Sequence, residues 1–340
     1  MLVDSDSQTE YGFRSLQEQP SVVRTLKGML DADRLPQGLL FSGMPGTGRD
    51  RAARTLMMHE NCASPSVPCG ACRSCTRIRN GQHPDFIRVT ATNGVVRVDS
   101  IRSLLERLIR KPHEARRRLV VLEQAESMNL EAANALLKVL EEPPEATCFI
   151  LLSEDPHRLP ATVRSRCQEI RFQPLSLHHL TDTVHGSAPD REAAEAAAKI
   201  ACGNLDLAFA LARESHKRRT LATILAAGLP LAPGTALTLS EWLAPDRVHA
   251  ETGLSILESL FRDICLAALD PDVLCIHGFS LDCREAILAA GKKILHEESL
   301  AIIRRIREVR RGMAQNILPR LALDAILLDL QYPSPCGYTG

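Results

Sequence analysis

The chain has 340 residues, of which 41 are basic and 41 acidic, and 45% of its residues are hydrophobic while 4% are aromatic. This composition is typical of a globular protein and excludes a disordered, collagen-like or highly charged one. Zero net charge also removes any argument for nucleic-acid binding by the whole molecule, although local basic patches are still allowed.

The first part of the chain predicts an α/β fold. Short apolar runs alternate with helical patterns, which is typical of parallel strands joined by crossover helices. The runs predict strands at residues 39–41, 86–89, 119–122, 149–152 and 169–172. We expect helix caps at Asp99 or Ser100 and at Asn129. Together these elements predict a parallel sheet with helices on both faces.

After Pro174 the pattern is helical to the end of the chain. Two alanine-rich helices at about 190–201 and 205–213 are broken at Gly203 and predict a small helical unit. One hydrophobic core seldom exceeds roughly 250 to 300 residues. We therefore expect two or three domains, and the pattern along the chain favours three: an α/β domain over 1–175, a small helical domain over 176–214 and a helical C-terminal domain over 215–335.

A glycine-rich turn follows the first predicted strand. Its sequence is GMPGTGRD, in which Gly43, Gly46 and Gly48 have the spacing of a phosphate-binding P-loop between a strand and a helix. A working P-loop continues with a lysine for the phosphates and a Ser or Thr for magnesium, but here Arg49 and Asp50 follow. Arginine lacks a compact ammonium, and a carboxylate about 4 Å from a phosphate repels it by about 4 kcal/mol. We expect a degenerate P-loop without tight ATP binding.

The strand at 119–122 agrees with this interpretation. In P-loop ATPases the corresponding strand carries acidic residues that hold magnesium and polarise water. Here Glu123 and Gln124 follow the strand, and a glutamine cannot act as a base. The alternative is an unrelated strand, turn and helix with a chance glycine pattern. The order of the two segments favours the degenerate P-loop.

Four of the 11 cysteines, Cys62, Cys69, Cys72 and Cys75, lie close together, whereas the others are scattered. An odd, scattered set does not resemble a disulfide framework. The overlapping CxxC steps predict a structural zinc site with four thiolate ligands. Reduced thiols without metal are one alternative and an iron–sulfur cluster is a lesser one. The neighbouring Arg73, Arg77 and Arg79 are more typical of a solvated face than of a DNA or partner contact.

Three features carry a resemblance to a known family: the segment NALLKVLEEPP at 134–144, the triplet Ser165, Arg166 and Cys167, and the cysteine cluster. With them the chain resembles the bacterial clamp-loader subunits of the AAA+ class, from DNA polymerase III, over almost its whole length. The resemblance implies an AAA+ ATPase-like domain with a zinc insertion, a helical lid and a C-terminal collar domain that joins other subunits in a pentamer. Residues 315–330 resemble the closing helix of that collar.

The resemblance also implies which kind of subunit this is. In the family's motor subunits the P-loop is intact, and an arginine after the position of Gly203 senses nucleotide, whereas residues 203–206 here contain none. A subunit without ATPase activity of its own is implied, with Arg166 acting as an arginine finger on ATP in the adjacent subunit. The alternative for Arg166 is an ion pair with a carboxylate such as Glu169 or Glu145. Arg164 would be the wrong choice if the register were misread.

The predicted function is thus a rigid, non-hydrolysing platform in the loading of a sliding clamp onto primed DNA, with motor subunits and a clamp-opening subunit as partners. The alternatives are an active motor ATPase of the same fold and a zinc-bearing DNA-binding adaptor, which zero net charge disfavours. The chain has no run of about 18 to 20 apolar residues. Its first residues, MLVDSDSQTE, are polar and acidic, unlike a signal peptide. We therefore expect a cytoplasmic protein with no membrane partner.

Overall fold

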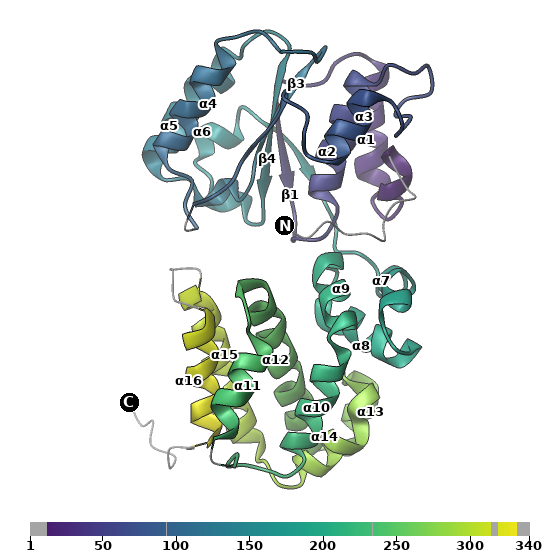
Figure 1. Ribbon diagram of the computed structural model, residues 1–340, viewed down its shortest axis with the longest axis vertical. Coiled ribbons are helices and arrows are strands. Elements are labelled where there is room, and N and C mark those ends of the chain that lie inside the picture. Colours follow the sequence, from purple (N-terminus) through teal and green to yellow (C-terminus); the bar gives the residue numbers. More distant parts are fainter. Residues whose placement is uncertain (1–11, 93, 233, 314–318, 332–340) are drawn as a thin grey trace. The chain divides into compact units, whose positions relative to one another are not determined.

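Figure 1 shows the computed structural model of the chain, which describes residues 12–92, 94–232, 234–313 and 319–331. The chain divides into two compact units, Met1–Pro174 and Leu175–Gly340. The further division of the helical part into a lid at 176–214 and a collar at 215–335 stays a prediction. Part of the stretch that resembles the closing collar helix, residues 315–318, lies outside the described residues.

The first unit contains a parallel sheet with helices around it. The strands are β1 (Gly38–Ser42), β2 (Phe86–Val89), β3 (Arg118–Leu122), β4 (Thr147–Ser153) and β5 (Gln168–Arg171). The helices are α1 (Pro20–Asp31), α2 (Arg49–Asn61), α3 (Arg73–Arg79), α4 (Val98–Leu108), α5 (Leu130–Glu141) and α6 (Ala161–Arg164), with short 3-10 turns η1 (Gly12–Leu16), η2 (Ala125–Ser127) and η3 (Pro156–Arg158). The strand order is β2-β3-β4-β1-β5, and all neighbours are parallel. The five predicted strands and the α/β fold are confirmed.

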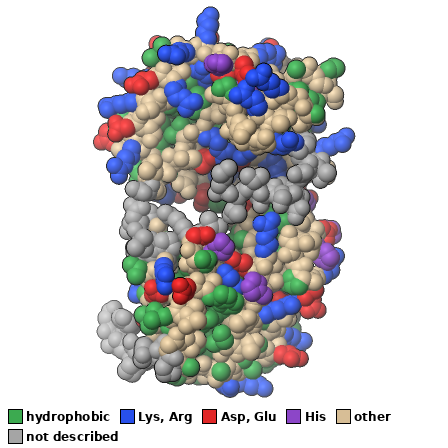
Figure 2. Space-filling view, viewed as in Figure 1, with side chains coloured by type: hydrophobic (Ala, Val, Ile, Leu, Met, Phe, Trp, Pro, Cys, Tyr) green, Lys and Arg blue, Asp and Glu red, His purple; other side chains and the backbone are tan. Residues whose placement is uncertain are grey.

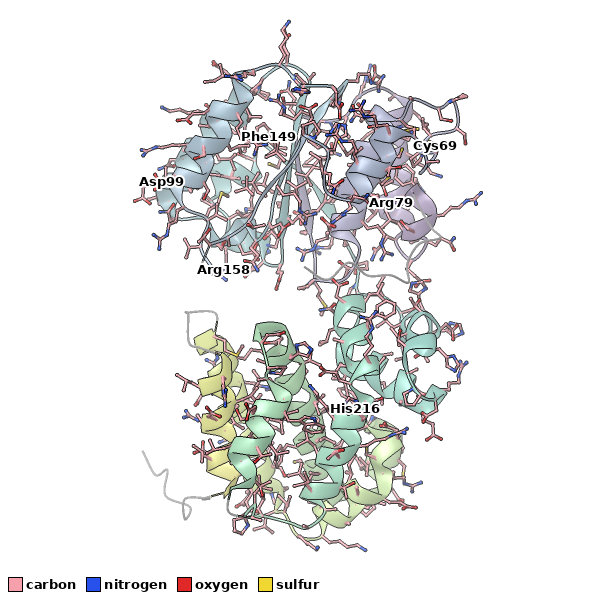
Figure 3. All side chains as sticks on the ribbon, viewed as in Figure 1. Cys69, Arg79, Asp99, Phe149, Arg158 and His216 are labelled. Carbon is pink, nitrogen blue, oxygen red and sulfur yellow. The ribbon has the colours of Figure 1, made fainter. Side chains whose placement is uncertain are left out.

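The two faces of the sheet bury alternate side chains of each strand. Leu39 and Phe41 of β1 belong to one buried cluster, with residues of α1, α2 and α3. Leu40 belongs to another, with residues of α4, α5 and α6. Phe149 of β4, labelled in Figure 3, is fully buried in this second cluster. Figure 1 shows these two sets of helices on opposite faces of the sheet, which explains why every residue of β1, β3 and β4 is buried.

The predicted helix caps have different outcomes. Asn129 caps α5, because its Oδ1 accepts a hydrogen bond from the backbone N of Ala132 at 3.0 Å. The prediction for α4 was wrong: this helix begins at Val98 and follows Arg97, so neither Asp99 nor Ser100 is its cap. The physical reason is that Val96 forms a parallel bridge to Met128, which fixes the extended chain just before α4 and starts the helix earlier.

The second unit is helical in the part of it that the structure describes. Its helices are α7 (Leu177–Val184), α8 (Arg191–Ala201), α9 (Leu205–Arg213), α10 (Ser215–Leu225), α11 (Thr235–Leu243), α12 (Arg247–Leu269), α13 (Pro271–His277), α14 (Arg284–Gly291), α15 (His296–Met313) and α16 (Pro319–Gln331). A fully buried ion pair joins Arg218 of α10 to Asp282 at 2.8 Å. Near it in the chain, His216, labelled in Figure 3, stacks edge-on against Trp242 of α11. Within the described ranges, no helix is long and apolar enough to cross a membrane.

Candidate functional site

The glycine-rich turn links β1 to α2, as the P-loop prediction requires. Gly43, Gly46 and Gly48 all have positive φ angles, of 142°, 68° and 96°. A Cβ atom at Gly43 would lie 2.6 Å from the carbonyl oxygen of Phe172, just after β5. Glycine is therefore required at this position for both its backbone angle and the close approach of a second chain segment.

Gln19, a buried residue before α1, fastens this turn to the segment after β5. Its Nε2 donates to the carbonyl oxygens of Thr47 at 3.3 Å and Gln173 at 2.6 Å. Its Oε1 accepts from the backbone N of Gln173 at 3.1 Å. These hydrogen bonds hold the glycine-rich turn in place through protein groups alone. Sequence reasoning missed Gln19, because its partners are distant in sequence.

Arg49 stands at the lysine position of the P-loop and faces two glutamates. Burial lowers the pKa of Arg49, while Glu154 and Glu126 act in the opposite direction. Burial raises the pKa of the Glu154 carboxyl, and nearby Glu126 raises it further. The backbone N of Glu154, directly after β4, also donates to Oε1 of Glu126 at 3.2 Å. Two carboxylates around one cation form a poor environment for phosphate oxygens.

Asp50 stands where a P-loop carries its magnesium-binding hydroxyl. Its Oδ2 lies 2.7 Å from Nε of Arg54, and its Oδ1 lies 2.6 Å from Nη1 of Arg88 on β2. Arg88 also donates from Nε to Oε1 of Glu123, the residue after β3, at 2.8 Å. Burial by itself would lower the pKa of Arg88, but Asp50 and Glu123 outweigh it and the pKa is raised. Sequence reasoning missed Arg88; the available signal was one cation in an otherwise apolar strand.

The four clustered cysteines come together between α2 and α3. The Sγ atoms of Cys62, Cys69, Cys72 and Cys75 all lie within 4.8 Å of one another. Cys62 directly follows α2, whereas Cys75 is a buried residue of α3. Cys69, labelled in Figure 3, lies on the loop between the two helices. The grouping predicted from the spacing is confirmed, and such a set could hold a metal ion.

Backbone N–H groups point at three of these sulfur atoms. The N atoms of Cys69, Cys72 and Cys75 donate to the Sγ atoms of Cys62, Cys69 and Cys72 at 3.4, 3.3 and 3.5 Å. Backbone N–H groups of Cys75 and Ala63 lower the pKa of Cys72 to about 6, and the pKa of Cys69 is also lowered. Burial raises the pKa of Cys75. Such N–H bonds favour thiolates, the form in which cysteine binds metals, so the donor set fits a metal ion.

The arginines beside the cysteines contact protein carboxylates. Arg77 forms an ion pair with Glu114, and Arg73 lies 3.9 Å from the same carboxylate. The backbone carbonyl of Arg79, labelled in Figure 3, accepts from Nη1 of Arg54 at 2.9 Å. Figure 2 shows basic side chains at many places on the visible face of the first unit, so they are not confined to this module.

Asp85 anchors the segment that carries Glu114. This buried carboxylate, just before β2, accepts the backbone N–H groups of His113, Glu114 and Ala115 at 2.8, 2.9 and 2.9 Å. Nε of Arg118 lies 3.5 Å away. Hydrogen bonds and ion pairs thus connect α3, which carries Cys75, through Glu114 and Asp85 to Arg118 at the start of β3.

Arg166 lies in the connection between α6 and β5. Its Nη1 donates to the carbonyl oxygen of Thr162 at 2.9 Å, and its Nη2 forms an ion pair with Glu141, the last residue of α5. The side chain of Arg166 is 35% exposed. Arg164 points to a different partner, His157, at 3.1 Å.

The carboxylate beside Arg166 differs from the two that the sequence suggested. Glu169 accepts a hydrogen bond from Oγ of Ser42 at 2.6 Å. Glu141 belongs to the 134–144 segment that carries the family resemblance, and sequence spacing gives no sign that the two meet. A Cβ atom at Gly38, the first residue of β1, would lie 2.9 Å from the carbonyl oxygen of Arg166. Arg166 is therefore at the start of β1, whereas the P-loop follows its end.

The comparisons with known proteins agree with these features. Residues 18–176 match the model of a family described as "DNA polymerase III, delta subunit". The delta' subunit of DNA polymerase III from Bacillus subtilis (strain 168) is 28% identical over 321 residues, which cover 92% of this chain and 96% of that protein. The delta' subunit from Escherichia coli (strain K12) is 32% identical over 227 residues, which cover 64% of this chain and 68% of that protein.

A subunit of a different name is similar over a shorter region. The tau subunit of DNA polymerase III from Bacillus subtilis (strain 168) is 34% identical over 168 residues, which cover 48% of this chain and 29% of that protein. The tau subunit from Escherichia coli (strain K12) matches 88% of this chain but 47% of its own length, whereas the two delta' relatives are matched over 96% and 68% of their own length. The chain belongs to the family of DNA polymerase III delta' subunits.

Proposed function

We propose that this chain is a non-hydrolysing clamp-loader subunit that lends Arg166 to the ATP bound in a neighbouring subunit. Membership of the delta' family supports a clamp-loader role within DNA polymerase III. Its partners are then the motor ATPase subunits and the clamp-opening subunit of a pentamer and, through them, the sliding clamp and primed DNA. The chain acts as a rigid platform in this assembly, in the cytoplasm.

The position of Arg166 relative to the P-loop carries this proposal. Arg166 contacts the first residue of β1, and the P-loop begins after Ser42, the last. At about 3.3 Å per residue, the strand separates the two by roughly 13 Å. The backbone of Arg166 thus lies at the opposite end of β1 from the chain's own P-loop, as expected for a finger that acts on a neighbour. Such fingers contribute about 10³ to 10⁵ in rate.

The P-loop residues support the absence of ATP hydrolysis by the chain itself. Arg49 replaces the lysine, and the negative charges of Glu154 and Glu126, which act to raise its pKa against burial, would oppose phosphate. Gln124 cannot accept a proton from water. An active motor ATPase, the alternative, would need a lysine and a hydroxyl residue at 49 and 50, and neither is present. ATP is therefore not a cofactor of this subunit.

We further propose that the cysteine cluster holds a structural zinc ion. Cys62, Cys69, Cys72 and Cys75 would each supply one thiolate, and four protein ligands would leave no position for a substrate. When bound, zinc cross-links the end of α2 to α3. The N–H groups aimed at Cys62, Cys69 and Cys72 stabilise their negative charge, and the ion itself would deprotonate the buried Cys75.

The test is an Arg166→Ala variant in a clamp loader reconstituted from all its subunits. We expect DNA-stimulated ATP hydrolysis to fall by about 10³ or more while the complex still assembles. Arg164→Ala is the matched control, since Arg164 lies two residues away and contacts His157 instead. Unchanged hydrolysis by an assembled Arg166→Ala complex would remove the finger assignment.

A further inference from the structure

Three charged side chains from different parts of the chain meet beside the P-loop. Asp50 comes from the first turn of α2, Arg88 from β2, and Glu123 from the residue after β3. Nη1 of Arg88 lies 2.6 Å from Oδ1 of Asp50, and its Nε donates to Oε1 of Glu123 at 2.8 Å. The backbone N of Glu123 also donates to the carbonyl oxygen of Val89 at 2.9 Å, which fixes Glu123 beside the end of β2.

The two carboxylates occupy the places of a metal site. In a P-loop ATPase, magnesium is held between the residue after the P-loop lysine and an acidic residue at the end of a second strand of the same sheet. Asp50 and Glu123 have these two positions here. A group in direct contact with both therefore stands where the ion would be. That group is the guanidinium of Arg88.

A guanidinium suits this place for simple chemical reasons. It is always charged and presents several N–H donors in a planar fork that can serve two carboxylates at once. Without it, Asp50 would keep its pair with Arg54, but Glu123 would lose its contact with Arg88, and the repulsion between two carboxylates in a partly buried site is several-fold larger than in water. Oxygen ligands of this kind are those that Mg²⁺ and Mn²⁺ prefer.

We propose that Arg88 replaces the magnesium ion of the P-loop, and that its removal uncovers a divalent-cation site formed by Asp50 and Glu123. The built-in cation keeps β2, α2 and the end of β3 together without any ligand. The inference rests on the proposed loss of the chain's own ATP site but not on the role of Arg166. Its test can therefore fail while the finger assignment stands.

The experiment measures Mn²⁺ binding to the full-length, zinc-loaded chain by electron paramagnetic resonance. We expect Arg88→Met to bind Mn²⁺ at least about tenfold more tightly than the unmodified protein, a gain of about 1.4 kcal/mol. Arg54→Met is the matched control: Arg54 pairs with the same Asp50 at 2.7 Å, but its Nη1 extends to the carbonyl of Arg79 instead of β3. This control should bind Mn²⁺ like the unmodified chain.

A triple variant, Arg88→Met with Asp50→Asn and Glu123→Gln, removes both ligands and should lose the added binding. A folded Arg88→Met protein with unmodified Mn²⁺ affinity would overturn the proposal. If Arg88→Met does not fold, the triple variant decides instead. Recovery of its fold supports the neutralising role of Arg88, whereas a triple variant that also fails to fold shows that Arg88 acts by packing and overturns it.

Discussion

The two ends of helix α2 differ in how their charged groups are neutralised. At its start, the P-loop region pairs its charges internally: Asp50 with Arg54 and Arg88, and Arg88 with Glu123. At its end, four cysteine sulfur atoms gather within 4.8 Å of one another, and three of them accept hydrogen bonds from backbone N–H groups. The nearby Arg77 is paired with Glu114 instead.

The P-loop region therefore needs no ligand to neutralise its charges, whereas the cysteine cluster does. Charges that are neutralised by side chains gain little from an incoming ion, because binding would first have to break the internal pairs. Thiolates without a cation of their own gain a great deal from zinc. Substitutions at the two ends of α2 should have the largest effects, and substitutions at Asp85 and Glu141 smaller ones.

Removal of a metal ligand should affect the end of α2 most. A structural zinc site contributes roughly 10 to 16 kcal/mol of binding free energy to folding, so Cys75→Ser should lose zinc and unfold at a markedly lower temperature. The measurements are metal analysis and thermal unfolding. Cys275→Ser changes an exposed cysteine on α13 and should match the unmodified chain. A purified chain without zinc whose unfolding temperature is unaffected by Cys75→Ser would contradict the zinc assignment.

Repair of the P-loop should change binding but not chemistry. The double variant Arg49→Lys with Asp50→Thr can raise ATP affinity by at most about a thousandfold, which corresponds to the repulsion of about 4 kcal/mol from an unpaired carboxylate. The gain should be smaller than this limit, because Arg54 and Arg88 already neutralise Asp50. Hydrolysis should still be absent, because Gln124 is no base. Equilibrium dialysis and phosphate release measure the two effects, with Arg51→Lys, an exposed neighbour, as control. Phosphate release by the isolated repaired chain would show that more of the ATPase has survived.

Replacement of Asp85 measures how much its hydrogen bonds contribute to the stability of the region around the cysteine cluster. Burial would raise the pKa of this carboxyl, but N–H bonds from Glu114, His113 and Ala115 outweigh it and the pKa is lowered. The stability from Asp85 is therefore present above about pH 4 and lost as the pH falls further. Asp85→Asn should cost about 3 kcal/mol in urea unfolding at neutral pH and weaken the acid dependence.

The control for this measurement is Asp99→Asn. Asp99, labelled in Figure 3, is 83% exposed and lies 3.6 Å from Arg102. Its replacement should change the free energy of unfolding by less than about 0.5 kcal/mol. An equally small change for Asp85→Asn would mean that the N–H cluster around Asp85 contributes little to the module.

The smallest effect is expected at Glu141, the partner of Arg166. The pair is partly exposed, so Glu141→Gln should cost less than about 1 kcal/mol of unfolding free energy. In the reconstituted loader, ATP hydrolysis should fall by less than about tenfold, since Arg166 itself is kept. Glu142→Gln, an exposed neighbour, is the control. A loss as large as that of Arg166→Ala would show that the ion pair is required to position the finger.

The sequence predicted the features that depend on local pattern. Continuous apolar runs located β1, β3 and β4, whose residues are buried on both faces of the sheet. The patterns for β2, which contains Arg88, and for β5, which is mostly exposed, were weaker but gave the right positions. The cap at Asn129 and the grouping of the four cysteines were also predicted correctly, because each depends on short spacings. The start of α4 was wrong because a bridge from Val96 to Met128 sets it.

The sequence could not predict which charges meet. Arg88 and Glu123 are 35 positions apart, and Arg166 and Glu141 are 25 apart. Their contacts follow from the pairing of β2 with β3 and from the packing of α5 near the start of β5. Such contacts depend on the tertiary structure. A charged residue within an apolar strand indicates that some partner exists but does not identify it.

Gly43 shows why glycine spacing alone is a weak diagnostic of ATP use. Its missing side chain makes room for the carbonyl oxygen of Phe172, a neighbour that is in place with or without a nucleotide. The architecture itself thus demands the first glycine of the fingerprint, and a chain can display that fingerprint whatever occupies the cradle. A survey of related sequences that scores the two residues after the last glycine, and not the glycines themselves, would better separate subunits that hydrolyse ATP from subunits that do not.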